Sequence, residues 1–145
     1  SAASSKLIHG GLRYLSNREY GLVRESLRER RILSNIASNF VYPLPMLFPH
    51  YRASLKSNKW VVKLGLATYD LLAYDRARTW DAGKRIPKHR SLSADEALRV
   101  QPVLKKEGLT GAAIFHDCLS IFPERLALGF IQSAAANGAA VANYA

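Results

Sequence analysis

The sequence predicts an α+β fold in which amphipathic helices accompany short strands. Apolar side chains recur at helical spacing between residues 20 and 37. A run with three prolines at residues 40–51 excludes a helix and favours extended chain. The last third, residues 109–145, alternates between strand-like and helical patterns. Because the chain has 145 residues, 48% hydrophobic and 22% charged, it can bury one core, and we expect a single folded fragment.

The helix expected over residues 20–37 has one apolar face and one charged face. The apolar face consists of Tyr20, Val23, Leu27, Leu33 and Ala37. Arg30 falls inside this apolar stripe. A buried guanidinium is costly unless it is paired, so we expect Arg30 to have a dedicated partner or to reach the rim of the core.

The proline-rich run is followed by a second apolar segment. Because proline cannot donate a ladder hydrogen bond, residues 40–51 are expected at the edge of a sheet. Ser57 is placed to cap a helix over residues 59–72. That helix is apolar nearly all round, so we expect it to be buried.

A polar connection and a short helix come next. Residues 75–90 are rich in arginine and lysine and are expected to form an exposed loop. Ser93 and Glu96 have the spacing of a capping box, which predicts a short helix that ends before Pro102.

The last third is expected to contain a strand, a helix and a second strand. Leu109 to His116 has the pattern of a strand, and Pro123 stands at the first position of a helix that Gly138 ends. The side chains expected on the inner face of that helix are Leu126, Ala127, Phe130, Ile131 and Ala134. Residues 139–144 are expected to form the final strand, in a sheet that needs neighbours from outside this segment.

The charge balance favours anionic partners. Lys and Arg number 21 against 11 Asp and Glu, which gives a formal charge of +10 and a surface that attracts phosphate ligands, nucleic acid or acidic lipid. The single cysteine, Cys118, excludes an internal disulfide and a cysteine-rich zinc site. No targeting signal is visible, and the most apolar window is too short to cross a bilayer. We therefore expect a cytoplasmic protein.

The segment SSKLIHGGLRYL, Ser4 to Leu15, collects groups that can bind a phosphate or an aromatic ring. A serine at its start can cap a helix whose free N–H groups meet an anion, and Lys6 adds a positive charge. The glycine pair permits close approach, Arg13 offers a planar fork, and Tyr14 offers a ring face. An ordinary capped helix with a glycine kink and a surface Arg and Tyr explains the same residues, so the pattern alone leaves both interpretations open.

SSKLIHGGLRYL, followed by LVRESLRERRIL and FVYPLPMLFPH, resembles the FAD-dependent glycerol-3-phosphate dehydrogenases of the D-amino-acid-oxidase-like flavoprotein superfamily. The resemblance continues in the same order through YDLLAYDR, KRIPKHRSLSADEAL, GLTGAAIFHDC and PERLALGFIQSAAANGAAVANY, and so covers essentially the whole chain. The run Phe122 to Leu126 departs from the pattern of many members and is similar to that of a related branch of the family. The resemblance implies an internal piece of a two-domain flavoprotein, without the N-terminal GxGxxG unit and the C-terminal part.

Under this resemblance the chain is a partial α/β FAD-binding fold in three segments. Residues 1–40 carry the flavin-facing motif and the long helix, residues 41–108 resemble the substrate domain, and residues 109–145 return to the FAD-binding layer. The residues implied to face the FAD are Ser4, Ser5, Lys6, Leu7 and His9. Arg13 and Tyr14 are implied to face the substrate pocket, and no catalytic residue or metal ligand is implied within this chain.

The reaction that the resemblance implies is hydride transfer from glycerol 3-phosphate to the flavin, which gives dihydroxyacetone phosphate, with electrons passed on to quinone. We expect this fragment alone to be inactive. Partners are then glycerol 3-phosphate and quinone in the complete enzyme, together with peripheral contact to the inner face of an anionic membrane and homo-oligomerisation. No nucleic-acid partner is expected.

Two alternatives stay open. A basic nucleic-acid-binding domain explains the charge, although the aromatic residues do not alternate with a Lys/Arg stripe as a stacking surface needs. The second alternative is a folded module without an activity of its own.

Outside the opening segment, His50, His89 and the basic run of residues 84–90 are expected to be solvated. Cys118 is expected to be a packed small residue rather than a nucleophile.

Overall fold

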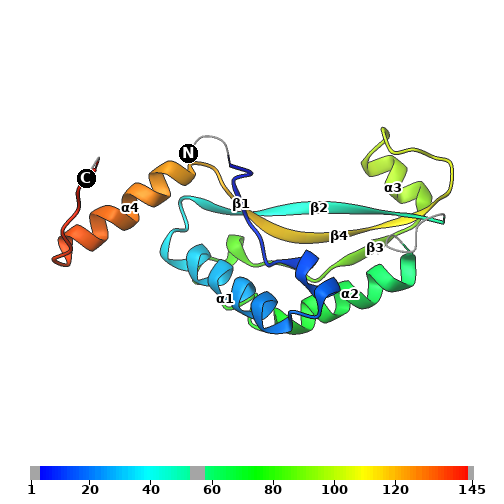
Figure 1. The fold of residues 1–145 in the computed structure, drawn as a ribbon. Coiled ribbons are helices and arrows are strands. Elements are labelled where there is room, and N and C mark those ends of the chain that lie inside the picture. Colours follow the sequence, from blue (N-terminus) through cyan, green and yellow to red (C-terminus); the bar gives the residue numbers. More distant parts are fainter. Residues whose placement is uncertain (1–3, 53–57, 144–145) are drawn as a thin grey trace.

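An antiparallel sheet forms the centre of the molecule in a computed structural model that describes residues 4–52 and 58–143. Its central strand is β4 (Leu109–Ser120), and β2 (Val41–Tyr51) pairs with β4 along its whole length. The other edge of β4 pairs with β1 (Leu7–Ile8) at one end and β3 (Arg90–Leu92) at the other. Helices together with this sheet confirm the α+β class, although two of the strands are long (Figure 1).

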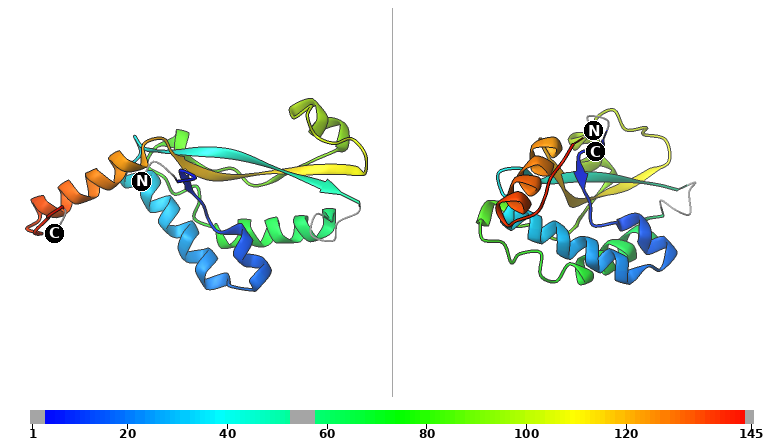
Figure 2. Two further views of the ribbon diagram at one scale, coloured as in Figure 1. Left: turned by 45° about the horizontal axis from the view of Figure 1, so that its top comes forward. Right: turned by 60° about the vertical axis from the view of Figure 1, so that its left-hand side comes forward.

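The helices lie around this sheet in different ways. α1 (Tyr20–Ile36) and α2 (Lys59–Leu72) lie on the same side of the sheet, as Figure 1 and both views of Figure 2 show. The short α3 (Ala94–Val100) lies at one end, whereas α4 (Pro123–Ala136) extends away from the other end. The described residues also contain two 3-10 turns, η1 (Leu12–Asn17) and η3 (Ala82–Lys84).

The prolines of β2 explain why this strand lies at an edge. Pro43, Pro45 and Pro49 all have odd numbers, and backbone N–H groups alternate between the two sides of a strand. The missing donors therefore lie on one side of β2, and the strand keeps its pairing with β4 on the other, with one register shift between His50 and Tyr51. The prediction of an extended edge segment is confirmed.

The main core fills the space between the sheet and the two helices below it. Its buried members are Val23 and Leu27 of α1, Leu66 and Tyr69 of α2, Ala73, and Ala113 and Phe115 of β4. A smaller cluster of Val41, Ile86 and Cys118 lies at the β1 end of the sheet, and Leu92, Ala97 and Ala112 bury α3 at the other. The amphipathic face predicted for α1 is thus confirmed at its centre.

Two predictions of helix burial were wrong. Within α2 the buried residues are Leu66 and Tyr69, while Trp60, Leu64 and Leu71 are more than 70% exposed. Within α4 no residue is buried. Both helices are apolar, but in the described part of the chain α2 has a neighbour on one face only and α4 extends beyond the sheet (Figure 2).

The predictions of helix caps and of a final strand have mixed outcomes. The capping box of Ser93 and Glu96 is present, and Gly138 follows α4 with a positive φ of 90°. Asn58, rather than Ser57, accepts the hydrogen bond that caps α2, and Ser57 lies outside the described residues. Residues 139–143 are not a strand, and Tyr144, the end of the expected final strand, also lies outside them. Among the described residues, no helix has the length and apolar character needed to cross a membrane.

Candidate functional site

The opening segment runs along the sheet edge and then turns into η1. Ser120 donates its backbone N–H to the carbonyl of Lys6 at 2.7 Å, and β1 continues this pairing with β4. Gly11, with φ 74°, begins the turn, and Tyr14 donates its N–H to the Gly11 carbonyl at 2.8 Å. The segment is therefore a short edge strand followed by a tight turn, rather than the capped helix that Ser4 or Ser5 could have begun.

An open groove of about 470 Å³ separates this segment from α1. The opening segment lines it with Leu7, Ile8 and His9. From α1 come Leu22, Glu25, Ser26, Glu29, Arg30 and Leu33. One wall of the groove is therefore an edge strand, and the other is a helix that carries both apolar and charged side chains.

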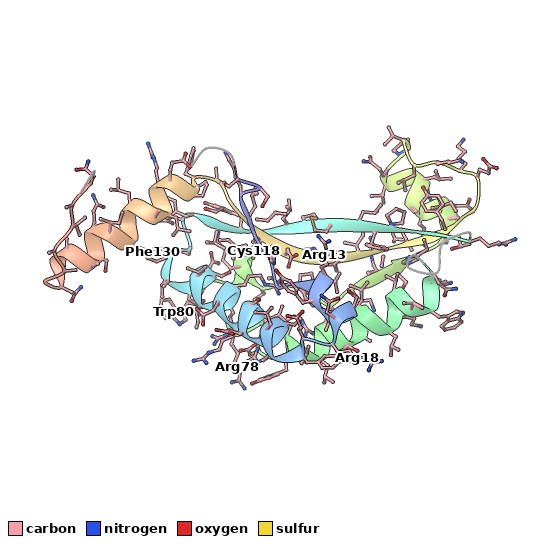
Figure 3. All side chains as sticks on the ribbon, in the orientation of Figure 1. Arg13, Arg18, Arg78, Trp80, Cys118 and Phe130 are labelled. Atoms are coloured by element: carbon pink, nitrogen blue, oxygen red, sulfur yellow. The ribbon has the colours of Figure 1, made fainter. Side chains whose placement is uncertain are left out.

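The structure brings some of the predicted site residues together and separates others. Leu7 and His9 line the groove, whereas Ser4, Ser5 and Lys6 are exposed outside it. Arg13 is exposed on η1, where Figure 3 labels it between the strands and the helices. Tyr14 packs against the main core, with its ring centroid 6.4 Å from that of His9. The seven residues do not share one concavity, and their roles stay predictions.

The groove suits a flat ring better than a phosphate. In the described residues β1 has a strand partner on one side, so its other side leaves backbone N–H and C=O groups for a ligand or a neighbouring strand. Leu7 adds half-buried apolar surface and His9 an exposed ring. Glu25 and Glu29 line the opposite wall, and carboxylates disfavour a phosphate. The residues present thus fit one wall of a flavin ring site, without a cradle for its phosphates.

A buried carboxylate holds the opening segment to the core. Asp117 of β4 accepts three hydrogen bonds at the same oxygen, Oδ1. The donors are Arg30 Nη1 at 2.6 Å, the Tyr69 hydroxyl at 2.7 Å and the backbone N–H of Gly10 at 2.9 Å. Arg30 also donates to the His116 carbonyl at 2.9 Å. Burial raises the pKa of Tyr69 far above its usual range, so its hydroxyl stays protonated and can donate.

A second buried carboxylate lies at the end of α2. Asp75 accepts two parallel hydrogen bonds from Arg24, at 2.8 and 2.9 Å, and one from Arg31 Nε at 3.0 Å. Arg24 additionally donates to the Leu72 carbonyl at 3.2 Å. The hydrogen bond from Arg24 is the main reason that the pKa of Asp75 lies below its usual range. This cluster joins α1 to α2.

The basic run of residues 84–90 is not simply solvated. Lys84 is buried and donates to the Val41 carbonyl at 2.9 Å, and its ammonium lies 3.3 Å from the centroid of the Tyr42 ring. His89 Nδ1 lies 2.7 Å from Asp70 Oδ2 at a second open groove of about 480 Å³. The loop is attached to the fold through Lys84 and His89, because each of these side chains lies within hydrogen-bond distance of a specific oxygen atom.

Two other predictions concern single buried groups. His50 was expected to be solvated, but this prediction is wrong: the residue lies on β2 and is 2% exposed. Cys118 is fully buried, and burial raises the pKa of its thiol, so the prediction of a packed residue is confirmed.

The network around Asp117 is the feature that the motif did not disclose. The prediction that Arg30 needs a partner is confirmed, with Asp117 in that role. The usable signal was Asp117, an acidic residue directly after the strand expected over Leu109 to His116, since a charge in apolar surroundings favours pairing with an opposite charge. The bond from Gly10 to Asp117 had no such signal, because it comes from the backbone.

Comparison with known proteins agrees with the family resemblance of the opening motif. Residues 1–145 match the family described as FAD dependent oxidoreductase (DAO). A glycerol-3-phosphate dehydrogenase of Synechocystis sp. is 40% identical over 144 residues, which cover 99% of this chain and 24% of the relative. A glycerol-3-phosphate dehydrogenase of Mycobacterium leprae is 37% identical over 145 residues, covering 97% and 22%. An aerobic glycerol-3-phosphate dehydrogenase of Staphylococcus epidermidis is 33% identical over 144 residues, covering 99% and 24%.

The chain spans about a quarter of the length of the curated relatives it matches. The family match, in contrast, takes in every residue, including the edge strand, the glycine pair and the long helix. The chain therefore belongs to the family of FAD dependent oxidoreductases.

Proposed function

We propose that this chain is part of an enzyme that oxidises glycerol 3-phosphate to dihydroxyacetone phosphate and passes the electrons to quinone. The observation that carries the proposal is the 31–40% identity to glycerol-3-phosphate dehydrogenases over nearly the whole chain. Bound FAD would supply the acceptor for the hydride from the substrate. The chain's own residues would then hold and orient the ring and the substrate.

The opening segment supports this division of roles. The free side of β1 and the half-buried Leu7 would meet the flavin ring, with His9 beside them and Ser4 to Lys6 contributing at the strand's start. Arg13 and Tyr14 follow on η1 and would reach the substrate, where a guanidinium fits the phosphate of glycerol 3-phosphate. A site with one wall here needs other walls from the longer protein, so the 145-residue chain alone would not turn over substrate.

The experiment is to produce the protein at the full length of its relatives and to measure flavin absorbance and glycerol-3-phosphate-dependent dye reduction. Arg13→Ala should lower kcat/KM by about 10-fold to 100-fold, as the loss of one charge-assisted hydrogen bond does. Arg28→Ala, which removes an exposed arginine from α1, is the matched control and should leave the rate unchanged. A colourless protein without this activity would reject the proposed function, and salt-dependent retention on DNA would then favour the nucleic-acid alternative.

A peripheral position on the inner face of an anionic membrane is a further part of the proposal. Its support is the outer face of α2 and the turn after it, where aromatic and aliphatic side chains lie exposed beside lysines. These exposed residues are Trp60, Leu64, Leu71 and Tyr74, accompanied by Lys59 and Lys63. Trp and Tyr next to Lys are typical of surfaces at the headgroup level of a bilayer.

Vesicle co-sedimentation of the complete protein tests this surface. The double variant Trp60→Ser, Leu64→Ser should weaken sedimentation with phosphatidylglycerol vesicles, while Leu128→Ser, Phe130→Ser on α4 is the control, which also removes one exposed aromatic and one exposed leucine side chain. Equal binding of both variants would remove α2 from the proposal. Light scattering of the same preparation tests the predicted homo-oligomer.

A further inference from the structure

We propose that Asp117 is a positioning residue, which fixes the backbone of Gly10 and thereby sets where His9 on one side and Arg13 on the other face the flavin and the substrate. This inference rests on the proposed function. Asp117 itself would touch neither ligand, because it is 5% exposed and its hydrogen bonds point into the core.

Three segments of the chain converge on one oxygen atom of Asp117. Asp117 Oδ1 accepts from α1 through Arg30, from α2 through Tyr69, and from the opening segment through Gly10. Gly10 and Asp117 are 107 residues apart in the sequence. A carboxylate that accepts from a backbone N–H makes a charge-assisted bond, about twice as strong as a neutral one. The opening segment is thus attached to the buried core by a charge-assisted hydrogen bond of its backbone.

Gly10 also packs directly against the side chains that bind Asp117. A Cβ atom at Gly10 would collide with the Tyr69 hydroxyl and with Leu27 Cδ2, so the backbone lies directly on the core. Arg30, Tyr69 and Gly10 are all buried, so their hydrogen bonds to Asp117 lie in surroundings of low dielectric constant, where such bonds are stronger than in water. The position of Gly10 is therefore set both by a hydrogen bond and by contact.

Gly10 lies between the predicted flavin-facing and substrate-facing parts of the opening segment. β1 ends at Ile8 and η1 begins at Leu12, so the hydrogen bond to Asp117 falls in the connection between the two elements. His9, which precedes Gly10, lines the groove next to α1. A displacement of Gly10 would move His9 and the start of η1 together, and with η1 the side chain of Arg13.

Asp75 provides the matched control. It is equally buried, at 4% against 5%, and it also pairs with arginines of α1. Its hydrogen bonds, however, go to Arg24 and Arg31 and none of those described reaches the opening segment. Loss of Asp75 should lower stability without moving Gly10.

The test compares Asp117→Asn, Tyr69→Phe and Asp75→Asn in the complete flavoprotein. The first readout is hydrogen–deuterium exchange of the peptide covering residues 7–15, measured without flavin. Exchange there should rise by about tenfold in Asp117→Asn, because the acceptor loses its charge, and by a smaller factor in Tyr69→Phe. Asp75→Asn should leave this peptide unchanged. If Asp117→Asn does not fold, Tyr69→Phe, which removes one hydroxyl, carries the comparison.

The second readout is FAD affinity, measured by flavin fluorescence well below the unfolding temperature. The dissociation constant should rise by about tenfold in Asp117→Asn and stay unchanged in Asp75→Asn. Equal changes in both variants, or unchanged exchange and affinity in the Asp117 and Tyr69 variants, would overturn the positioning role. The proposed function has its own criterion, dye reduction by the unmodified protein, and neither readout here uses glycerol 3-phosphate.

Discussion

Asp117 and Asp75 are two carboxylates that hold the same helix, α1, in two different settings. Asp117 pairs with Arg30, whose side chain is 2% exposed, whereas Asp75 pairs with Arg24 and Arg31, whose side chains are 25% and 23% exposed. The first cluster also includes the backbone of the opening segment. The second joins α1 to the end of α2.

The difference shows that similar ion pairs can have different consequences. Arg24 and Arg31 can turn toward water when their partner is lost, but Arg30 cannot, so the Asp117 cluster has the larger energetic effect. Because Gly10 belongs to the Asp117 cluster, that cluster also connects stability to the predicted site.

Removal of one partner of the Asp117 pair should have the largest effect. Asp117→Leu leaves the Arg30 cation buried without compensation and should lower the free energy of unfolding by about 3–5 kcal/mol. The double variant Arg30→Met, Asp117→Leu replaces the pair by apolar groups and should recover most of that loss. Urea unfolding of the two single variants and the double variant measures the coupling. A double variant as unstable as the sum of the singles would show that the two residues act independently.

Gly10→Ala should have the next largest effect, through packing alone. The added methyl group collides with Tyr69 and Leu27, and overpacking of a core costs about 1–3 kcal/mol. Gly129→Ala is the control: this position lies in α4, no atom of the described residues, apart from the adjacent residues and backbone of its own helix, lies within 4 Å of the added methyl group, and alanine favours a helix by about 0.5–1 kcal/mol. Thermal unfolding should therefore give a lower Tm for the first variant and an equal or higher Tm for the second. A Gly10→Ala variant as stable as the unmodified protein would contradict the close packing.

The elements that the sequence predicted correctly are those set by neighbouring residues. The apolar period defines α1, the odd-numbered prolines define an edge strand, and the Ser93–Glu96 spacing defines the capping box. Each of these depends on contacts within about ten residues. Burial of α2 and α4 depends on which layers cover them, and composition alone does not contain that information.

The location of the candidate site could be predicted from the sequence, but the hydrogen bonds that hold its backbone in place could not. The segment from Ser4 to Tyr14 stands out by residue type, and the unusual position of Arg30 indicated a buried partner. The partner lies 87 residues away, and the third participant is a backbone N–H that any residue could supply. Long-range pairing of this kind follows from the register of β1 and β4, which the local pattern does not specify.

Asp75→Asn should show a smaller effect that depends on pH. Both arginines regain water, so we expect a loss of about 1 kcal/mol at neutral pH. The pKa of Asp75 is lowered in the folded protein, and its stabilising contribution is therefore complete above the unfolded-state value and lost as pH falls through the folded-state value. The difference between the variant and the unmodified protein should shrink when urea unfolding is repeated in steps below about pH 4. A difference that stays constant into strong acid would mean that Asp75 does not titrate with its arginines.

The smallest expected effect is on His116, which lies beside the Asp117 cluster. Burial lowers its pKa first, and the charge of Arg30 lowers it further, whereas His50 is affected by burial and by Lys59. In the double variant Arg30→Met, Asp117→Leu, the pKa of His116 should rise while that of His50 stays fixed, as NMR titration of the two rings would show. Because both folded-state values lie below the ordinary value of about 6.5, unfolded chains bind more protons, and stability falls as pH drops from there through the folded-state values. That fall should be smaller in the double variant, because His116 then differs less from its unfolded state. An unchanged His116 titration would place Arg30 too far from the ring to influence it, and would confine the Asp117 cluster to α1, α2 and Gly10.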